Sequence, residues 1–133
     1  CRIPTLSDEE GLIVHRGKSA FVVMNLYPYN PGHLLVCAYR HVADLTELTT
    51  EERHEITDLS AHAMTVIRKV SKADGFNLGM NQGAISGAGV AAHIHQHIVP
   101  RWSGDANFMP IIGTTKVLPQ LLTTTRDELA AAW

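Results

Sequence analysis

The sequence has no long apolar run, no basic run and too few cysteines for a disulfide framework. No hydrophobic stretch approaches the roughly 20 residues that a membrane-spanning helix needs, and none has the layout of a signal peptide. The 11 lysines and arginines are scattered, and with 13 aspartates and glutamates they give a formal net charge of −2. This balance argues against a nucleic-acid-binding surface. We therefore expect a cytoplasmic protein without nucleic-acid or membrane partners.

The length and the two cysteines bound the domain organisation. With 133 residues, of which 45% are hydrophobic, residues 1–133 are expected to form one domain with a single core. Cys37 lies inside an apolar run and is interpreted as a buried core residue. The chain starts at Cys1 and not at an initiator methionine, so we expect that residues are missing upstream.

Three segments have the composition and alternation of β-strands. They cover residues 20–26, 33–38 and 76–81. The loop between the first two contains two prolines and a glycine, which forbid regular structure, so this pair is expected to form an antiparallel hairpin. In the third segment, alternation places three apolar residues on the core face: Phe76, Leu78 and Met80.

Two segments have helical signals. Thr49 and Glu52 form a capping-box pair, which places the start of a long helix near Thr50 and its end near Lys72. Its apolar residues recur at spacings of three and four: Ile56, Leu59, Ala63, Ile67 and Val70. Two histidines, His54 and His62, fall off this stripe and are expected to face solvent. A last helix is expected to start at Pro119 and to run towards Trp133. The order of elements predicts an α+β domain, an antiparallel sheet with helices packed on one side.

Three histidines alternate with other residues in segment 91–100, Ala-Ala-His-Ile-His-Gln-His-Ile-Val-Pro. Two is the strand period, so His93, His95 and His97 should stand on one face of a strand, with consecutive members about 7 Å apart. A chance cluster on a solvated edge is the alternative. Each imidazole on such a face needs hydrogen-bond partners when it is even half buried. We therefore interpret this face as a chemical site.

A glycine-rich loop, residues 83–89, leads directly into the histidine segment. It lacks the Gly-Lys-Ser/Thr ending of a Walker loop, and it precedes a strand where a dinucleotide-binding motif would open a helix. Glycines nevertheless let backbone N–H groups approach an anion closely. Beside three histidines we interpret the loop as a phosphate cradle; a flexible hairpin connection is the alternative.

Histidine can itself be a nucleophile towards phosphorus and form a covalent intermediate. The attacking nitrogen must be neutral, and an acceptor at the other ring nitrogen must fix the tautomer. His95 has a histidine on each side, which makes it the best candidate nucleophile. Clustered histidines also ligate zinc, and this alternative stays open.

The segment His-Ile-His-Gln-His-Ile-Val resembles the signature of the histidine triad (HIT) superfamily, nucleotide hydrolases and transferases that act at an α-phosphate. Residues 30–36 resemble the family's entry into a strand, and Asn25 and Gln82 stand at the spacings of its ribose-binding and phosphate-binding positions. Residues 99–108 resemble, more specifically, a bacterial branch that includes diadenosine tetraphosphate phosphorylases. The resemblance implies an antiparallel sheet of about five strands, with a long helix and a C-terminal helix packed against it. It also implies a homodimer.

The resemblance further implies a role for each matched residue. His95 would attack the α-phosphorus, His93 and His97 would contact phosphate oxygens, and His33 would support the site. Asn25 would hold the ribose hydroxyls. The residues expected to bind the nucleotide are Asn25, Gln82, Gly87, Ala88 and Gly89.

One signature position departs from the family, and one metal site is implied by it. Gln96 stands where relatives usually have an apolar residue; it should point away from the histidine face and alter packing, not mechanism. Many relatives hold a structural zinc with two cysteines and two histidines. In this chain the matching ligands would be Cys1, His41 and His93, with one cysteine lost upstream. No cofactor is expected for the chemistry itself.

The expected function is cleavage at the α-phosphate of adenosine polyphosphates through a nucleotidyl-His95 intermediate, with inorganic phosphate or water as the acceptor. The likeness over residues 99–108 favours phosphorolysis of diadenosine tetraphosphate. Hydrolysis of the same substrate, cleavage of a nucleoside phosphoramidate, and a catalytically weak nucleotide-binding module are the alternatives.

Overall fold

The computed structural model describes residues 2–87, 89–105 and 121–133. Five strands form one antiparallel sheet in the order β1-β2-β3-β5-β4. The strands are β1 (Ile13–Arg16), β2 (Ala20–Met24), β3 (Leu34–Ala38), β4 (Gly75–Met80) and β5 (His95–Arg101). The helices are α1 (Thr50–Ser71) and α3 (Leu122–Ala132), and the short 3-10 turns are η1 (Ile3–Thr5), η2 (Leu45–Glu47) and η3 (Ala84–Ser86). This arrangement confirms the expected α+β fold.

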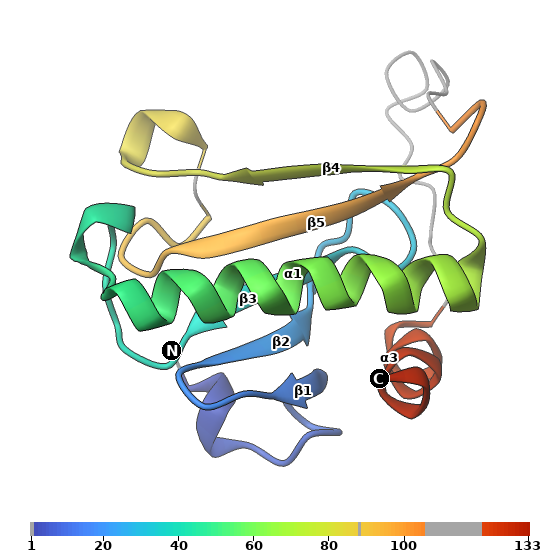
Figure 1. The fold of residues 1–133 in the computed structure, drawn as a ribbon, viewed down its shortest axis with the longest axis horizontal. Helices are drawn as coiled ribbons and strands as arrows, with labels where there is room; N and C mark the ends of the chain where they lie inside the picture. Colours follow the sequence, from blue (N-terminus) through green and yellow to red (C-terminus); the bar gives the residue numbers. More distant parts are fainter. Residues whose placement is uncertain (1, 88, 106–120) are drawn as a thin grey trace.

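The two faces of the sheet differ in what covers them. Helix α1 runs across one face, with α3 next to it (Figure 1). The main core lies between this face and the helices; its buried residues include Val22, Leu34, Val36, Ile67, Ile98 and Leu129. The opposite face carries a smaller cluster: Ile13, Phe21, Val23 and Cys37. Cys37 is therefore buried as predicted, and the face without α1 is left for the histidines of β5.

Helix α1 has the expected boundaries. The Thr49 hydroxyl accepts a hydrogen bond from the Glu52 N–H at 3.2 Å, and the Glu52 carboxylate accepts one from the Thr49 N–H at 2.8 Å, which completes the capping box. Lys72 ends the helix in the left-handed region at φ +55°. Its off-stripe histidines, His54 and His62, are exposed as predicted. Among the described residues, neither helix combines the length and the apolar character needed to cross a membrane.

The last helix begins later than predicted. Leu121 has ψ 127°, an extended conformation, so α3 starts at Leu122. The predicted first-turn residue, Pro119, lies outside the described residues, as do Cys1, Ala88 and the tail residues 106–120.

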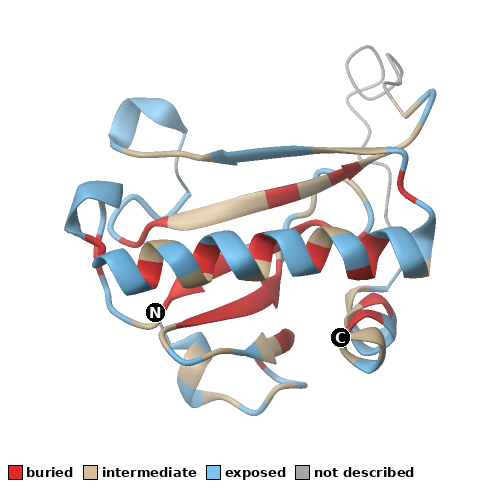
Figure 2. Ribbon diagram, viewed as in Figure 1, coloured by how far each residue is buried: buried red, intermediate tan, exposed pale blue. Residues whose placement is uncertain are grey.

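Leu78 faces the α1 side of the sheet, the core face on which it was predicted, but it is 47% exposed. Strand β4 is an edge strand, and its middle residues, Asn77, Leu78 and Gly79, are exposed (Figure 2). The alternation of residues 76–80 therefore predicted a strand correctly. Alternation shows which side chains share a face of the sheet, but it does not show whether another element covers that face.

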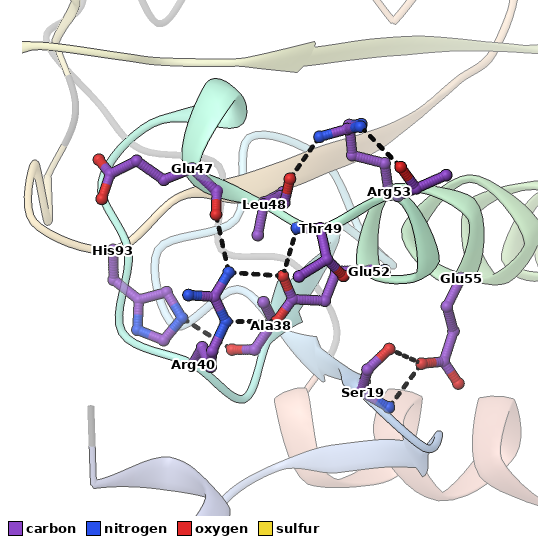
Figure 3. A network of polar contacts seen from close by, with 11 residues as sticks. Ser19, Ala38, Arg40, Glu47, Leu48, Thr49, Glu52, Arg53, Glu55 and His93 are labelled. Atoms are coloured by element: carbon purple, nitrogen blue, oxygen red, sulfur yellow. Dashed lines mark hydrogen bonds and ion pairs between the residues drawn. The ribbon is translucent and has the colours of Figure 1, made fainter.

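Two carboxylates of helix α1 make hydrogen bonds to residues next to the strands of the sheet (Figure 3). Arg40, just beyond β3, donates from Nε and Nη2 to the Glu52 carboxylate at 2.8 and 2.7 Å, and this lowers the pKa of Glu52 to about 2. Glu55 accepts the backbone N–H groups of Lys18 and Ser19 in the turn between β1 and β2. These contacts fix the helix against strands on which the site depends.

Candidate active site

Two of the three alternating histidines lie on the open face of the sheet, on the strand next to its β4 edge. β5 lies between β3 and β4, and His97 pairs with Leu35 on one side and with Gly79 on the other. His95 pairs with Cys37. Residues paired across neighbouring strands share a face, so each imidazole stands beside an apolar side chain towards β3, and His97 also stands beside a glycine towards β4. Their ring centroids are 4.8 Å apart.

A chain of hydrogen bonds fixes the protons of His33 and His97. The Tyr29 N–H points at His33 Nδ1 at 3.1 Å, and His33 Nε2 lies 2.9 Å from His97 Nδ1. An amide N–H can only donate, so His33 Nδ1 is the acceptor and its proton is on Nε2. His33 therefore donates to His97 Nδ1, which leaves the His97 proton on Nε2. This Nε2–H is buried and has no partner among the described residues.

His95 has the complementary arrangement. Its Nδ1 lies 2.9 Å from the carbonyl oxygen of His93, so Nδ1–H donates to that oxygen. The neutral ring then carries its lone pair on Nε2. The site thus presents a nucleophilic nitrogen on His95 next to a hydrogen-bond donor on His97, the pairing that attack on phosphorus requires.

Burial keeps two of these imidazoles neutral. Desolvation, with help from the neighbouring His97 and His95, lowers the pKa of His33 to about 4. Desolvation and His95 also lower the pKa of His97. Both rings are therefore neutral near pH 7, which is the state that the hydrogen-bond chain requires.

The third alternating histidine, His93, lies apart from this pair. It is 7% exposed, and its Nε2 is 2.8 Å from the carbonyl oxygen of Ala38 (Figure 3). Burial lowers its pKa, so its neutral ring donates to that oxygen. The His93 backbone carbonyl is the acceptor that orients His95. In this structure the His93 carbonyl therefore orients the His95 ring, and the expected contact of His93 with a phosphate oxygen stays a prediction.

The predicted nucleotide-binding residues are only partly brought together. The Asn25 amide nitrogen lies 3.3 Å from His33 Nδ1, and its oxygen accepts the Tyr27 N–H at 3.1 Å, so Asn25 stands at the site but also caps the loop. The Gln82 oxygen accepts the Leu45 N–H at 2.8 Å, which ties this side chain to η2. Gly87 and Gly89 are exposed. Their roles, and that of Ala88, stay predictions.

Sequence reasoning missed a cleft of about 370 Å³ that opens beside His97. Its lining includes Tyr29, Asn30, Asn77, Gly79, Asn81, His97, Val99 and Arg101. Asn77, Gly79 and Asn81 alternate along the chain, so the period of two would have placed them on the face opposite Leu78. Their proximity to the histidines depends on the pairing of β4 with β5, which no local pattern specifies.

The predicted zinc ligands are tested only in part by the geometry. The rings of His41 and His93 lie edge to face with centroids 5.1 Å apart. A metal-bound histidine usually donates its second N–H to a carbonyl oxygen, and His93 makes such a bond to Ala38. Cys1 lies outside the described residues, and within the described ones no three His, Cys, Asp or Glu side chains form a metal-binding group. Two predicted ligands are thus adjacent, and zinc itself stays a prediction.

Comparison with known proteins places this geometry in a family. The model of the HIT domain matches residues 8–104. The chain is 55% identical over 131 residues to an AP-4-A phosphorylase of Mycobacterium tuberculosis, an alignment that covers 98% of this chain and 67% of that protein. It is 36% identical over 93 residues to an asymmetrical bis(5′-nucleosyl)-tetraphosphatase of Schizosaccharomyces pombe, with 70% of this chain and 50% of that protein covered.

The fold is shared with solved structures as well. A Zn-bound histidine triad family protein from Mycobacterium smegmatis superimposes with a TM-score of 0.74 at 24% identity, over 91% of this chain and 82% of that one. The family model, the relatives and the arrangement of His33, His95 and His97 agree. The chain belongs to the HIT domain family.

Proposed function

We propose that this protein cleaves dinucleoside polyphosphates, diadenosine tetraphosphate above all, at an α-phosphate through a nucleotidyl-His95 intermediate. The observation that carries the proposal is the pair of fixed tautomers: a lone pair on His95 Nε2 beside an N–H on His97 that has no partner in the part of the chain that the structure describes. The relatives named AP-4-A phosphorylase and bis(5′-nucleosyl)-tetraphosphatase support the choice of substrate.

In the first step the His95 Nε2 lone pair forms a bond to the α-phosphorus, and the bond from that phosphorus to the bridging oxygen breaks. The bond's electrons leave with the oxygen of the departing nucleoside triphosphate. The His97 Nε2–H donates a hydrogen bond to the oxygens around this phosphorus, on which negative charge increases. Asn25 would hold the ribose of the retained adenylyl group, next to His33.

In the second step an oxygen of inorganic phosphate attacks the same phosphorus. The phosphorus–nitrogen bond breaks, the lone pair returns to His95 Nε2, and ADP leaves. Water in place of phosphate would give AMP. Phosphate is our choice because the relative that matches 98% of this chain is named a phosphorylase.

Product analysis decides between the acceptors. With diadenosine tetraphosphate and inorganic phosphate, we expect ADP and ATP in equal amounts, with ³²P from labelled phosphate appearing in ADP. The control omits phosphate and should show little turnover. AMP and ATP formed at the same rate with and without phosphate would make the protein a hydrolase. Turnover limited to adenosine 5′-phosphoramidate, or binding without turnover, would favour the remaining alternatives.

The proposal includes a cytoplasmic location and a homodimer. The dimer interface would lie along β4, an edge strand of the sheet. A groove of about 490 Å³ lies between α1 and β4, and its lining includes Ile56, Met64, Leu78 and Met80. An edge strand presents unpaired backbone groups, and a second copy of β4 would both pair with them and fill the groove. Leu78→Asp should convert a dimer into a monomer in light scattering. Ile85→Asp, at a fully exposed residue in η3, is the matched control. A monomeric unmodified protein would contradict the dimer.

The proposal requires no cofactor for the chemistry, because His95 itself supplies the nucleophile. Structural zinc at Cys1, His41 and His93 is a separate proposal, supported by the adjacent rings of the two histidines. Elemental analysis of the purified protein decides it: less than a stoichiometric amount of zinc would contradict this site.

A further inference from the structure

On the open face of the sheet, the residues on the two sides of His97 differ in character. Towards β3, His97 pairs with Leu35, and Leu35 pairs in turn with Val23 of β2. Towards β4, His97 pairs with Gly79. Neighbouring strands are about 4.8 Å apart, so this row crosses the face from an apolar side, near Asn25, to an open polar side. The cleft beside His97 belongs to the second side and does not reach Asn25 or Leu35.

We propose that this cleft is the binding site of the departing nucleotide, so that the leaving nucleoside polyphosphate lies over Gly79 between Tyr29, Asn77 and Arg101. This inference rests on the proposed function and divides its substrate between two subsites. The adenylyl group that is transferred to His95 would lie on the β3 side. The atoms joining the two halves would cross His97, whose Nε2–H lies at the boundary and has no partner among residues 2–87, 89–105 and 121–133.

The cleft has groups suited to each part of a nucleoside polyphosphate. Arg101 donates to both Asp105 oxygens and to Asn77 Oδ1, which uses three of its five N–H donors and leaves two for phosphate oxygens. Asn77, with its oxygen taken by Arg101, has amide N–H groups to donate. Asp105 holds the guanidinium in one orientation through two hydrogen bonds, so these donors are already aligned.

Tyr29 has the position and exposure of a stacking platform. Its ring is nearly parallel to that of His97, at an interplanar angle of 13° and a centroid distance of 6.0 Å, and the residue is 69% exposed. A large aromatic side chain with this exposure, at the mouth of a cleft, has a free face for a nucleobase. A volume of about 370 Å³ lies within the range of small-molecule sites.

Gly79 provides a test that blocks the cleft without disturbing the fold. A Cβ placed there meets no atom within 4 Å, and its φ lies outside the left-handed region, so valine fits the strand. Gly79→Val would fill the floor between His97 and the rest of the cleft. Gly75→Val is the matched control: Gly75 lies on the same strand and the same face, its Cβ also meets nothing within 4 Å, and it does not line the cleft.

The measurement is calorimetric binding of two probes, AMP and a methylene-bridged, uncleavable analogue of diadenosine tetraphosphate. The unmodified protein should bind the analogue more tightly than AMP. Gly79→Val should lower the affinity for the analogue by about 10-fold or more, as expected for the loss of a stacked base. Its affinity for AMP should stay within about twofold of that of the unmodified protein. Gly75→Val should change neither. Tyr29→Ala should also weaken the analogue selectively.

Two results would overturn the subsite. One is equal affinity of the unmodified protein for AMP and the analogue, and the other is equal weakening of both probes by Gly79→Val. Because binding is measured without turnover, these results are separate from a failure of the proposed reaction. That failure would appear as absent turnover and absent nucleotidyl-His95 in a protein that still binds the analogue selectively.

Discussion

Replacing His95 with alanine is expected to abolish turnover, with kcat reduced by roughly 10⁴-fold or more, while the fold and most of the nucleotide affinity are kept. The lone pair on its Nε2 forms the covalent bond, so no other described group replaces it in the first step. His95 is only partly buried and its one ring hydrogen bond goes to a backbone carbonyl, so the fold loses little. The measurements are turnover, AMP binding, and mass spectrometry of protein quenched during turnover.

The comparison variants separate this mechanism from a catalytic metal. His97→Ala removes a donor and not the nucleophile, so its loss should be smaller, about 10²- to 10⁴-fold. His54→Ala, at an exposed position on α1, should behave like the unmodified protein. Full activity in His95→Ala, with no nucleotide attached to His95 in the quenched unmodified protein, would refute the intermediate. Equal losses in His93, His95 and His97 variants, together with inhibition by chelators, would favour a metal site.

The protein is expected to lose stability as the pH falls from about 6.5 towards 4, and His33 should account for much of the loss. The unfolded chain binds a proton at His33 below its ordinary pKa of 6.5, while the folded protein resists this until about pH 4. The main physical cause is the burial of the ring, which disfavours its charged form, and the neighbouring His97 and His95 add to it. Between pH 7 and 5 the free energy of unfolding should fall by on the order of 1–2 kcal/mol.

Urea unfolding at pH 7 and pH 5 measures this effect. His33→Gln removes the titrating group and keeps a polar side chain, so the difference between the two pH values should shrink. His93 and His97, whose pKa values are also lowered, should supply what is left. His54→Gln is the control and should keep the full difference. A pH dependence that is the same in His33→Gln and in the unmodified protein would contradict the lowered pKa of His33.

The fold could be predicted from the sequence wherever a local signal sets the structure. The capping box at Thr49 and Glu52 satisfies backbone donors at one particular turn, and it marked the start of α1 correctly. A local signal does not decide how far a side chain is covered: Leu78 lies on the predicted face of β4, but on this edge strand it is 47% exposed. The start of α3 was predicted too early, because Leu121 is not helical and the helix begins at Leu122.

The residues of the site could be predicted from the sequence, but the protonated nitrogen of each imidazole could not. The spacing of His95 and His97 gives the face on which they stand. Which nitrogen of each ring is protonated depends on the Tyr29 N–H and the His93 carbonyl, and these are aimed by the loop and by the entry into β5. His93 shows the limit most clearly, because an alternating pattern does not distinguish a ring in the cleft from a ring buried against Ala38.

The order of the strands has a consequence for when the chemistry appears during folding. β1, β2 and β3 pair as neighbours in sequence, whereas β5 comes last and enters between β3 and β4. His33 and His97, which must meet, are 64 residues apart. Closing so long a loop carries an entropic cost, which makes the insertion of β5 a late event. A nascent chain that has not yet placed its final strand therefore lacks the hydrogen bond from His33 that sets the tautomer of His97, and we expect reactivity towards nucleotides to begin only when the sheet is complete.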